Sequence, residues 1–205
     1  MDNKKGKLIV VSGPAGSGKG TVNSILLSNT EKYVFSVSAT TRSPRPGEID
    51  GTHYFFMTRE KFMSLVDAGE FLEHAEYVGN CYGTLRPFVE EKLSSGKNVI
   101  LDIEVQGALQ VREKMPEAVL VFLCPPDYVT LEGRLRGRGT ETDEVIKKRL
   151  LKALEELQEA EKYDYLVVNE DGKAADCANV IDRIIDTCPE KNKEYILNFI
   201  KNFTE

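Results

Sequence analysis

A glycine-rich stretch near the start of the chain reads Gly13-Pro14-Ala15-Gly16-Ser17-Gly18-Lys19-Gly20-Thr21 and directly follows the apolar run Leu8-Ile9-Val10-Val11. Its glycines let the backbone turn tightly enough to aim several N–H groups at one anion. The apolar run is predicted to form a short buried strand, and residues 21–27 to form a helix with Val22, Ile25 and Leu26 facing inward. A strand, such a loop and a helix N-terminus in that order are typical of a site for the phosphates of a nucleoside triphosphate.

The loop matches the phosphate-binding pattern GxxxxGK through Gly13, Gly18 and Lys19. We expect the lysine to reach the outer phosphates while the helix N-terminus faces the anion. The next position departs from the pattern, because Gly20 stands where a Ser or Thr hydroxyl usually meets Mg²⁺. Thr21 offers its hydroxyl one residue later, so we predict phosphate contact there and Mg²⁺ held mainly through water and the phosphates. The alternative, a glycine-rich turn with a solvated lysine, is disfavoured by the flanking strand and helix.

The composition is that of an ordinary globular protein, with 205 residues of which 41% are hydrophobic and 29% charged. A chain of this length forms one compact unit or a core with small inserts. The net charge of −6 argues against a general nucleic-acid or membrane-surface binder. No apolar stretch approaches the length of a secretory signal core or a membrane span, so we expect a cytoplasmic protein that binds neither nucleic acid nor membrane.

The cysteines and histidines are not spaced as metal ligands or redox pairs. The cysteines are scattered without a CxxC pair, and reduced thiols are predicted for Cys81, Cys124, Cys177 and Cys188. His53 and His74 also lack metal-ligand spacing to each other, so structural roles are predicted for both.

Strand-like and helix-like segments alternate after the loop. This alternation predicts an α/β fold of the P-loop type, in which a parallel sheet lies between two layers of helices in a three-layer αβα arrangement. The predicted core strands are residues 8–12, 33–37, 98–103, 118–123 and 165–168. Right-handed crossovers in such a sheet place ligands at the carboxyl ends of the strands.

Two segments break the alternation. Residues 38–96 contain a Pro/Arg/Gly-rich loop, strand-like runs, a short helix over about 58–69 and a Gly79-Asn80 turn, which predict a small mixed insert with its own hairpins. Residues 127–160 contain an arginine-rich hinge between a helix that begins near Asp127 and a long helix after the predicted N-cap Thr142, which predicts a helical lid. The predicted core is residues 1–37, 97–126 and 161–205, and its C-terminal helical region is broken near Pro189.

The insert begins with a loop in which Arg42 and Arg45 lie three residues apart among prolines and hydroxyl residues. Two guanidinium groups held in this way suit a second phosphate, although a solvated basic loop is the usual fate of exposed arginines. Tyr54 and Tyr82 could add phenolic donors, but aromatic residues in strand-like runs more often serve packing.

The predicted strand over 98–103 ends in an acidic side chain, Asp102, and Glu104 follows shortly after it. P-loop folds place an acid here, near Mg²⁺ and its waters, so Asp102 is the predicted metal contact, through water. Alternation along a strand puts Asp102 and Glu104 on the same side of the chain. The alternative is one helix-capping acid and one surface acid.

These segments together resemble the guanylate kinase family. Besides the P-loop, the resemblance is carried by SATTRSPRPGE at Ser38 to Glu48, by Gly51 and Tyr54, and by FLEHAE at Phe71 to Glu76. It continues through GNCYG at Gly79 to Gly83, ILDIEVQG at Ile100 to Gly107 and RLRGRGTET at Arg134 to Thr142, so it runs in consistent order from about Lys7 to Asn169. The resemblance implies the fold of nucleoside monophosphate kinases, with a core, a GMP-binding insert and a lid.

The resemblance also implies roles for individual residues. The GMP phosphate would be held by Arg42, Arg45, Tyr54 and Tyr82, and guanine would be read by Ser38, Glu73, Thr84 and Glu104, with Asp102 also in the GMP site. A carboxylate suits guanine because it accepts from the N1–H and N2–H₂ donors, whereas facing adenine N1 it would be left unpaired. The family often has Asp where this chain has Glu104. The predicted acceptors are GMP and dGMP, and no residue can be assigned to the ribose 2′-hydroxyl group.

On the donor side, the resemblance implies that the lid arginines Arg134, Arg138 and Arg149 close over the transferring phosphoryl group, and that Asn169 lies near the adenine of ATP, with Arg138 also in the ATP site. The predicted reaction is in-line transfer of the γ-phosphoryl group from ATP with Mg²⁺ to a GMP phosphate oxygen, with Lys19 and the arginines neutralising charge.

Two alternatives to this function remain. One is a kinase for another monophosphate, since GSGKGT also resembles adenylate kinases, and the other is a non-catalytic module that binds protein ligands in the GMP cleft.

Overall fold

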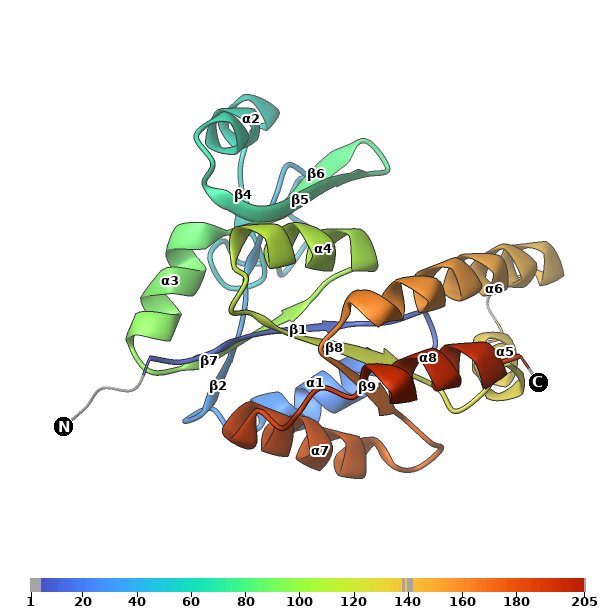
Figure 1. Ribbon diagram of the computed structural model, residues 1–205. Helices are drawn as coiled ribbons and strands as arrows, with labels where there is room; N and C mark the ends of the chain where they lie inside the picture. Colours follow the sequence, from blue (N-terminus) through green and yellow to red (C-terminus); the bar gives the residue numbers. More distant parts are fainter. Residues whose placement is uncertain (1–4, 138, 140–141, 205) are drawn as a thin grey trace. The chain divides into compact units, whose positions relative to one another are not determined.

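Two β-sheets organise the chain, one with five parallel strands and one with four strands of mixed direction. The computed structural model describes residues 5–137, 139 and 142–204 (Figure 1). The five-stranded sheet has the order β2-β7-β1-β8-β9, with bounds Tyr33–Phe35, Asn98–Asp102, Leu8–Ser12, Val119–Cys124 and Tyr165–Val168. The predicted α/β fold with a parallel sheet and a small mixed insert is therefore confirmed.

The core strands lie close to their predicted positions. β1 and β9 have the predicted bounds, β7 ends one residue early, β8 is shifted by one residue, and β2 ends two residues early at Phe35. Every residue of β1 and of β8 is buried, as expected for apolar runs covered on both faces. Strand alternation does not extend to Glu104, because β7 ends at Asp102 and the next helix begins at Val105.

The chain divides into two compact units. The first unit comprises residues 1–8, 30–101 and 106–118, and the second comprises residues 9–29, 102–105 and 119–205. In the first unit β2 and β7 pair in parallel, and in the second β8 pairs in parallel with β1 and with β9.

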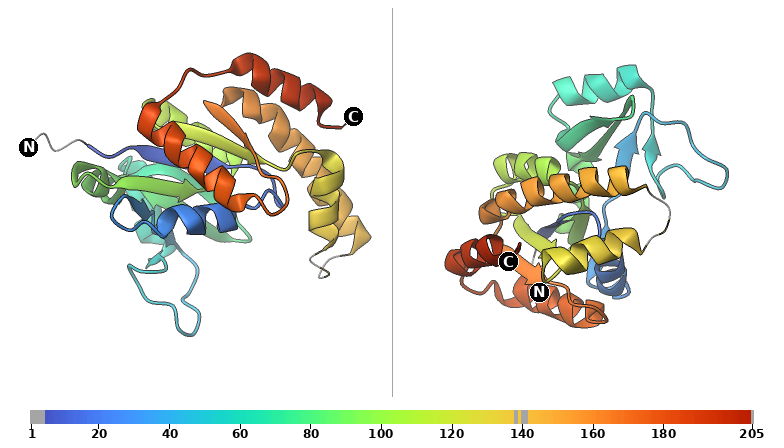
Figure 2. Two further views of the ribbon diagram at one scale, coloured as in Figure 1. Left: turned by 90° about the horizontal axis from the view of Figure 1, so that it is seen from below. Right: turned by 90° about the vertical axis from the view of Figure 1, so that its right-hand side faces the viewer.

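Helices surround the strands of the second unit. They are α1 (Lys19–Leu27), α5 (Tyr128–Arg136), α6 (Asp143–Gln158), α7 (Ala174–Thr187) and α8 (Lys193–Asn202), with a 3₁₀ turn η1 over Glu159–Lys162. α1 and α7 lie side by side (Figure 2). The gap between α7 and α8 contains Pro189, which confirms the predicted break. No helix among residues 5–137, 139 and 142–204 is long and apolar enough to cross a membrane.

The inward face of α1 differs from the predicted one. Val22 and Leu26 are buried, as predicted, but Ile25 is exposed and Asn23 is buried in its place. Residues 22, 23 and 26 lie on one face of a helix with 3.6 residues per turn, and Ile25 lies at the margin of that face. The prediction for Ile25 was wrong because hydrophobicity alone gave no reason to turn the polar Asn23 inward.

Side-chain caps start the two helices of the predicted lid. The Asp127 carboxylate accepts a hydrogen bond from the Thr130 N–H at 2.7 Å, and the Thr142 hydroxyl accepts from the Val145 N–H at 3.4 Å. Both predicted helix starts are therefore confirmed. The apolar spacing along α6 predicts that Ile146, Leu150, Leu154 and Leu157 face inward; Ile146, Leu150 and Leu157 are buried, but Leu154 is only half-buried.

Asp164 is a buried carboxylate that ties the start of β9 to its neighbours. Its Oδ2 atom accepts from the Leu120 N–H at 2.9 Å, and its Oδ1 atom lies 2.6 Å from Lys191 Nζ. We expect Asp164→Ala to destabilise the protein by about 2 kcal/mol, because it leaves a buried backbone N–H unpaired. A melting-curve comparison should show a loss of roughly 4–8 °C. The exposed ion pair of Glu159 with Lys162 gives a control, and Glu159→Ala should change the melting temperature by about a degree or less.

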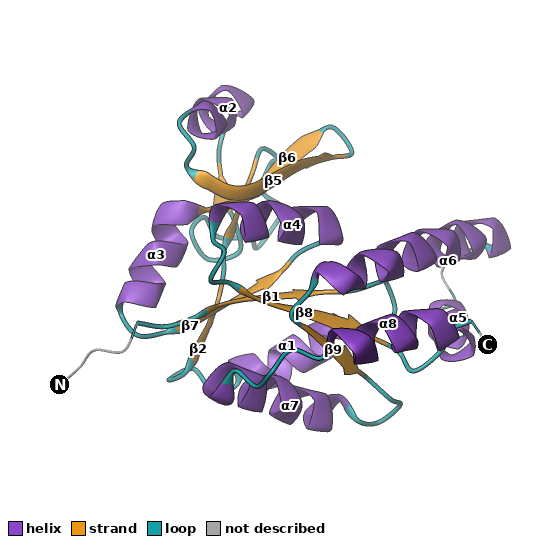
Figure 3. Cartoon of the chain, viewed as in Figure 1, coloured by secondary structure: helices purple, strands orange, loops and turns teal. Residues whose placement is uncertain are grey.

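In the first unit, the four-stranded sheet has the order β4-β3-β6-β5, with bounds Phe55–Phe56, Ser38–Thr40, Asn80–Leu85 and Phe71–Tyr77. The helices of this unit are α2 (Arg59–Asp67), α3 (Arg86–Ser94) and α4 (Val105–Lys114), and α2 lies against β5 (Figure 3). Phe62 of α2 stacks on Phe71 of β5 with ring centroids 4.4 Å apart. Together with Ala39 and Cys81 these rings form a separate small core, so the insert buries its own apolar side chains.

The hairpin between β5 and β6 turns one residue earlier than predicted. Tyr77 pairs with Asn80, so the two turn residues are Val78 and Gly79 and not Gly79 and Asn80. Both turn residues have positive φ, 48° and 74°, as the favoured two-residue hairpin turn requires. A β-branched residue rarely adopts this conformation, and for that reason the pattern did not predict Val78 in the turn.

Candidate functional site

Two glycines of the P-loop occupy positions where no other residue fits. Gly13 has φ of 145°, and a Cβ atom there would lie 2.0 Å from the Leu123 carbonyl oxygen. Gly18, the N-cap of α1, has φ of 88°, and its Cβ atom would lie 2.3 Å from Asn169 Nδ2. The loop therefore packs its backbone directly against the end of β8 and against Asn169, the residue after β9.

The side chain of Lys19, the first residue of α1, folds back onto the start of the P-loop. Its Nζ atom donates to the carbonyl oxygens of Gly13 and Pro14, at 2.6 and 3.3 Å. The N-terminus of α1 has no side-chain cap, so the first-turn N–H groups and the positive end of the helix dipole face the loop. An ammonium group and a helix N-terminus around one loop are the features from which anion sites are built, and the binding of a nucleotide phosphate here stays a prediction.

Asn169 and Arg134 hold the outer side of the P-loop. The Asn169 side chain is buried, and its Nδ2 atom donates to the Ser17 carbonyl oxygen at 2.8 Å. Arg134 donates to the Asn169 carbonyl oxygen at 2.7 Å and to the Gly16 carbonyl oxygen at 3.4 Å, and it pairs with Asp171 at 2.7 Å. Both residues thus contact the loop. Their predicted contacts with adenine and with the transferring phosphoryl group stay predictions.

Acidic side chains gather near Lys19 within the second unit. Burial raises the pKa of Asp102, and the Lys19 ammonium and the Asn23 carboxamide oppose this rise. Glu104 is exposed, and its carboxylate lies 3.1 Å from Lys152 Nζ of α6. Lys152 also pairs with Glu156, at 3.5 Å, whose pKa is raised by burial. Sequence reasoning missed Lys152 and Glu156, because on the sequence they are indistinguishable from ordinary solvated charges along a helix.

The arginine loop of the first unit is organised by a carboxylate. Glu48 accepts from Arg42 Nη2 at 2.8 Å and from the Arg45 N–H at 2.7 Å. The hydrogen bond from Arg42 lowers the pKa of Glu48 to about 2. The Glu48 carboxylate is therefore ionised, and paired with Arg42, at neutral pH. The Arg45 side chain is exposed. Glu48 lies within the segment that carries the resemblance, but only the folded loop shows that it orients Arg42.

Two tyrosines, for which the family resemblance implies contact with the GMP phosphate, lie beside Arg42. The guanidinium carbon of Arg42 lies 5.3 Å from the Tyr54 ring centroid, and Tyr54 and Tyr82 meet edge to face at 6.2 Å. The Glu48 hydrogen bond raises the pKa of Arg42, and Tyr82 adds to that effect. The fold thus brings a guanidinium and two phenols, drawn from a loop and β6, to one place.

Ser38, Thr84 and Glu73 lie in one row across the four-stranded sheet. Ser38 of β3 pairs with Thr84 of β6, which pairs with Glu73 of β5. The Thr84 hydroxyl donates to Glu73 Oε1 at 2.7 Å, and both residues are buried. Burial raises the pKa of Glu73, and the Thr84 hydrogen bond and the Lys114 charge oppose this rise. A buried carboxylate with one oxygen already satisfied is suited to accept further hydrogen bonds from a ligand.

The predicted site residues therefore fall into two sets. The first unit holds Ser38, Arg42, Arg45, Tyr54, Glu73, Tyr82 and Thr84, and the second holds the P-loop, Asp102, Glu104, Arg134, Arg149 and Asn169. Arg149 lies on α6 and is partly exposed. Arg138 lies outside the described residues.

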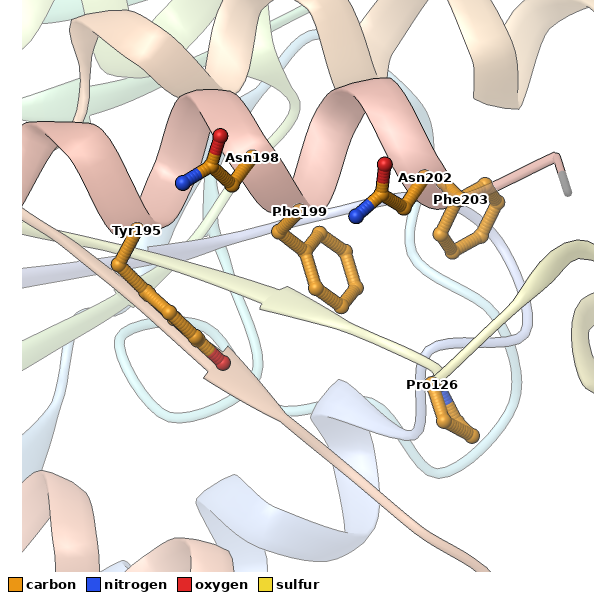
Figure 4. A pocket seen from close by; sticks show the side chains of 6 residues that line it. All are labelled: Pro126, Tyr195, Asn198, Phe199, Asn202 and Phe203. Atoms are coloured by element: carbon orange, nitrogen blue, oxygen red, sulfur yellow. The ribbon is translucent and has the colours of Figure 1, made fainter.

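A pocket of the second unit is lined by other residues than these. It has a volume of about 250 Å³ and is lined by residues of α8, by the C-cap residue of that helix and by Pro126 (Figure 4). The lining residues are Pro126, Tyr195, Asn198, Phe199, Asn202 and Phe203. The Tyr128 N–H donates to the Phe203 carbonyl oxygen at 3.0 Å, which ties the end of α8 to the start of α5. None of the lining residues is predicted to bind a nucleotide.

Comparison with known proteins gives one consistent family. The family model described as Guanylate kinase matches residues 5–186. The guanylate kinase of Halalkalibacterium halodurans is 54% identical over 184 residues, which are 90% of this chain and 88% of that protein. The guanylate kinase of Streptococcus pyogenes serotype M3 is 53% identical over 186 residues, which are 90% of this chain and 87% of that protein. The crystal structure of guanylate kinase from Anaplasma phagocytophilum is similar with a TM-score of 0.66 and 33% identity, and the match covers 95% of each chain.

Proposed function

This chain belongs to the guanylate kinase family and transfers a phosphoryl group from ATP to GMP, giving ADP and GDP, and we propose that two sets of its residues divide this work. The residues of the first unit named above bind GMP, and those around the P-loop bind ATP. The observation that carries this proposal is the row Ser38, Thr84 and Glu73, which contains a buried carboxylate. The same unit holds Arg42 with Glu48, Tyr54 and Tyr82, which we call the Arg42 cluster.

The Arg42 cluster is suited to the phosphate of GMP. Arg42 is held by Glu48, and the rings of Tyr54 and Tyr82 stand beside it, so guanidinium and phenol donors converge without further ordering. Arg45 is exposed and follows three residues later in the same loop, where it would add a second cation. A preorganised set of this kind binds the dianion and holds its oxygens for attack.

The Glu73 row is suited to guanine. The free lone pairs of the Glu73 carboxylate would accept from guanine N1–H and N2–H₂, while Thr84 satisfies the remaining acceptor. Adenine offers an acceptor at N1, which would face the carboxylate unpaired in a buried setting. Ser38 adds a hydroxyl from β3 in the same row. We keep Asp102 and Glu104 as additional GMP contacts.

The donor set consists of the P-loop with Lys19, Arg134, Arg149 and Asn169, and of Arg138 in the part of the chain that is not described. The acceptor oxygen is already anionic at neutral pH, so no strong general base is needed. Catalysis then rests on holding the two nucleotides in line and on neutralising the charge of the transferring group by Lys19 and the arginines.

The residues near Lys19 fit a role for Mg²⁺. Asp102 offers carboxylate oxygens, the ligand type Mg²⁺ prefers, and its burial-raised pKa would be lowered again by a neighbouring cation. Residues 5–137, 139 and 142–204 contain no cluster of three acidic, His or Cys side chains suited to a metal. We therefore propose that Asp102 holds the ion through water and that the phosphates supply its direct ligands. The bound ion supplies charge neutralisation at the β- and γ-phosphates.

A panel of nucleoside monophosphates tests the guanine assignment. With ATP and Mg²⁺, we expect GMP and dGMP to be phosphorylated with kcat/KM at least about a hundredfold above AMP, UMP and dTMP. AMP turned over as well as GMP would overturn the assignment of the Glu73 row to guanine.

The orienting role of Glu48 gives a separate prediction. Glu48→Gln should raise KM for GMP roughly threefold to tenfold and leave KM for ATP unchanged, because Arg42 loses its ionic partner but keeps its charge. The low pKa of Glu48 means that this contact is fully present above pH 4.5 and is lost only as the pH falls through about 2, so the effect should be constant from pH 6 to 9. Initial rates against GMP concentration measure this, and Glu60→Gln on α2 is the control. Equal KM values for Glu48→Gln and the control would contradict the assignment.

A further inference from the structure

Glu73 lies on a strand with an irregular and unpaired side. β5 is the last strand of the four-stranded sheet, and within the part of the chain that the structure describes it pairs only with β6. The register between β5 and β6 shifts between Phe71 and Glu73, so the ladder is interrupted directly before the predicted guanine-reading residue. The ladder with β6 therefore restrains the backbone of Glu73 from one side, and contacts along the other edge of β5 add to that restraint.

Helix α4 supplies the missing hydrogen bonds along the outer edge of β5. Gln110 Oε1 accepts from the His74 N–H, and Gln110 Nε2 donates to the His74 carbonyl oxygen, both at 3.1 Å. Lys114 Nζ donates to the Phe71 carbonyl oxygen at 2.8 Å. Gln110 and Lys114 are four residues apart and therefore share one face of the helix. The Gln110 carboxamide thus pairs with His74 as a neighbouring strand would, and the three bonds fall on both sides of Glu73.

We propose that Gln110, supported by Lys114, is a positioning residue that sets the GMP specificity of this enzyme by fixing the backbone on either side of Glu73. The inference rests on the proposed guanine-reading role of Glu73. Two hydrogen bonds from guanine to one carboxylate require both acceptor oxygens at the correct distance and angle, and hydrogen bonds weaken steeply with misalignment. The Glu73 side chain can meet that requirement only if its backbone does not slide along β6.

Charge supports the same assignment. The Lys114 ammonium opposes the burial that raises the pKa of Glu73, and it therefore favours the ionised carboxylate that accepts from guanine. The next residue along the strand is His74, whose pKa is lowered by burial and by Lys114, so it adds no positive charge at neutral pH. Gln110 and Lys114 thus hold the backbone on either side of Glu73, and Lys114 also favours the ionised form of its carboxylate.

Gln110→Met tests the proposal, because methionine keeps the length and flexibility of glutamine and removes both hydrogen-bonding groups. We expect KM for GMP to rise about tenfold, because two part-buried hydrogen bonds beside Glu73 are lost, while kcat and KM for ATP change less than about twofold. The GMP-to-AMP ratio of kcat/KM should fall by a similar factor. Glu113→Ala, an exposed position on the same helix, is the control and should match the wild type. An unchanged KM for GMP, or equal rises for GMP and ATP, would overturn the proposal.

A double-mutant cycle with Glu73→Gln tests the positioning role of Gln110 separately from the guanine-reading role of Glu73. If Gln110 acts through Glu73, Gln110→Met should change KM for GMP less than about twofold in the Glu73→Gln background. If Glu73→Gln alone leaves the GMP-to-AMP ratio unchanged, the guanine-reading role fails. If it lowers the ratio but Gln110→Met does not, the positioning role alone fails. Should Gln110→Met not fold, Lys114→Met serves instead, with an expected rise of about threefold in KM for GMP and the same criteria.

Discussion

Lys19→Ala should reduce kcat by at least about a hundredfold, the largest loss we expect from any single substitution in the P-loop. The Lys19 ammonium is the cation held inside the loop by the Gly13 and Pro14 carbonyl oxygens, so it is positioned before any phosphate arrives. In the proposed mechanism its charge acts on the outer phosphates of ATP, where negative charge is redistributed during transfer. The measurement is the initial rate at saturating ATP and GMP.

A second lysine of the same unit provides the control for that substitution. Lys162→Ala removes an ammonium whose partner is Glu159, at 2.6 Å on the surface. Its turnover should equal that of the wild type, because an exposed ion pair contributes little. A kcat for Lys19→Ala within about threefold of the control would remove Lys19 from the catalytic set.

Glu73→Gln should lower kcat/KM for GMP by about a hundredfold while changing that for AMP much less. The amide retains one acceptor, which can still accept from the Thr84 hydroxyl, but it loses the charge and presents donors toward the guanine N–H groups. Discrimination between GMP and AMP therefore collapses. Glu76→Gln, on the exposed part of the same strand, is the matched control and should keep the wild-type ratio. A GMP-to-AMP ratio equal in both variants would contradict the role of Glu73.

The same substitution should stabilise the free protein. Because burial raises the pKa of Glu73, its ionised form costs folding free energy at neutral pH, and this cost disappears as the pH falls through the raised pKa. Glutamine carries no charge, so Glu73→Gln should melt at a higher temperature than the wild type at pH 8, and the difference should shrink on acidification. A lower melting temperature at pH 8 would show that the charge is compensated in the folded state.

Much of the donor side could be predicted because its signal is local in the sequence. The P-loop glycines and Lys19 follow a fixed pattern, and an apolar strand and a helix flank them directly. The helix start near Asp127 and the N-cap Thr142 are likewise local signals, and both predictions were correct. Hydrophobic spacing failed at α1, where the polar Asn23 is buried and Ile25 is exposed, because the packing of α1 against α7 decides that face.

The residues of the proposed acceptor side were named from the family resemblance, but the sequence did not predict how the sheet arranges them. Nothing near Glu73 in the sequence shows that it pairs with Thr84 or that Gln110 binds the backbone of the next residue, since 11 and 36 residues separate these partners. The turn at Val78 was missed because a β-branched residue at positive φ contradicts local preference. Contacts between distant segments and local strain are set by the packed insert, and periodicity does not report them.

Calorimetric titration of GMP, without ATP, into Lys19→Ala and Glu73→Gln side by side tests most directly the claim that separate residue sets serve the two nucleotides. We predict that Lys19→Ala binds GMP with a Kd within about threefold of the wild type, and that Glu73→Gln binds it at least about tenfold more weakly. An equal loss of GMP affinity in both variants would contradict the division between a donor set around Lys19 and an acceptor set around Glu73.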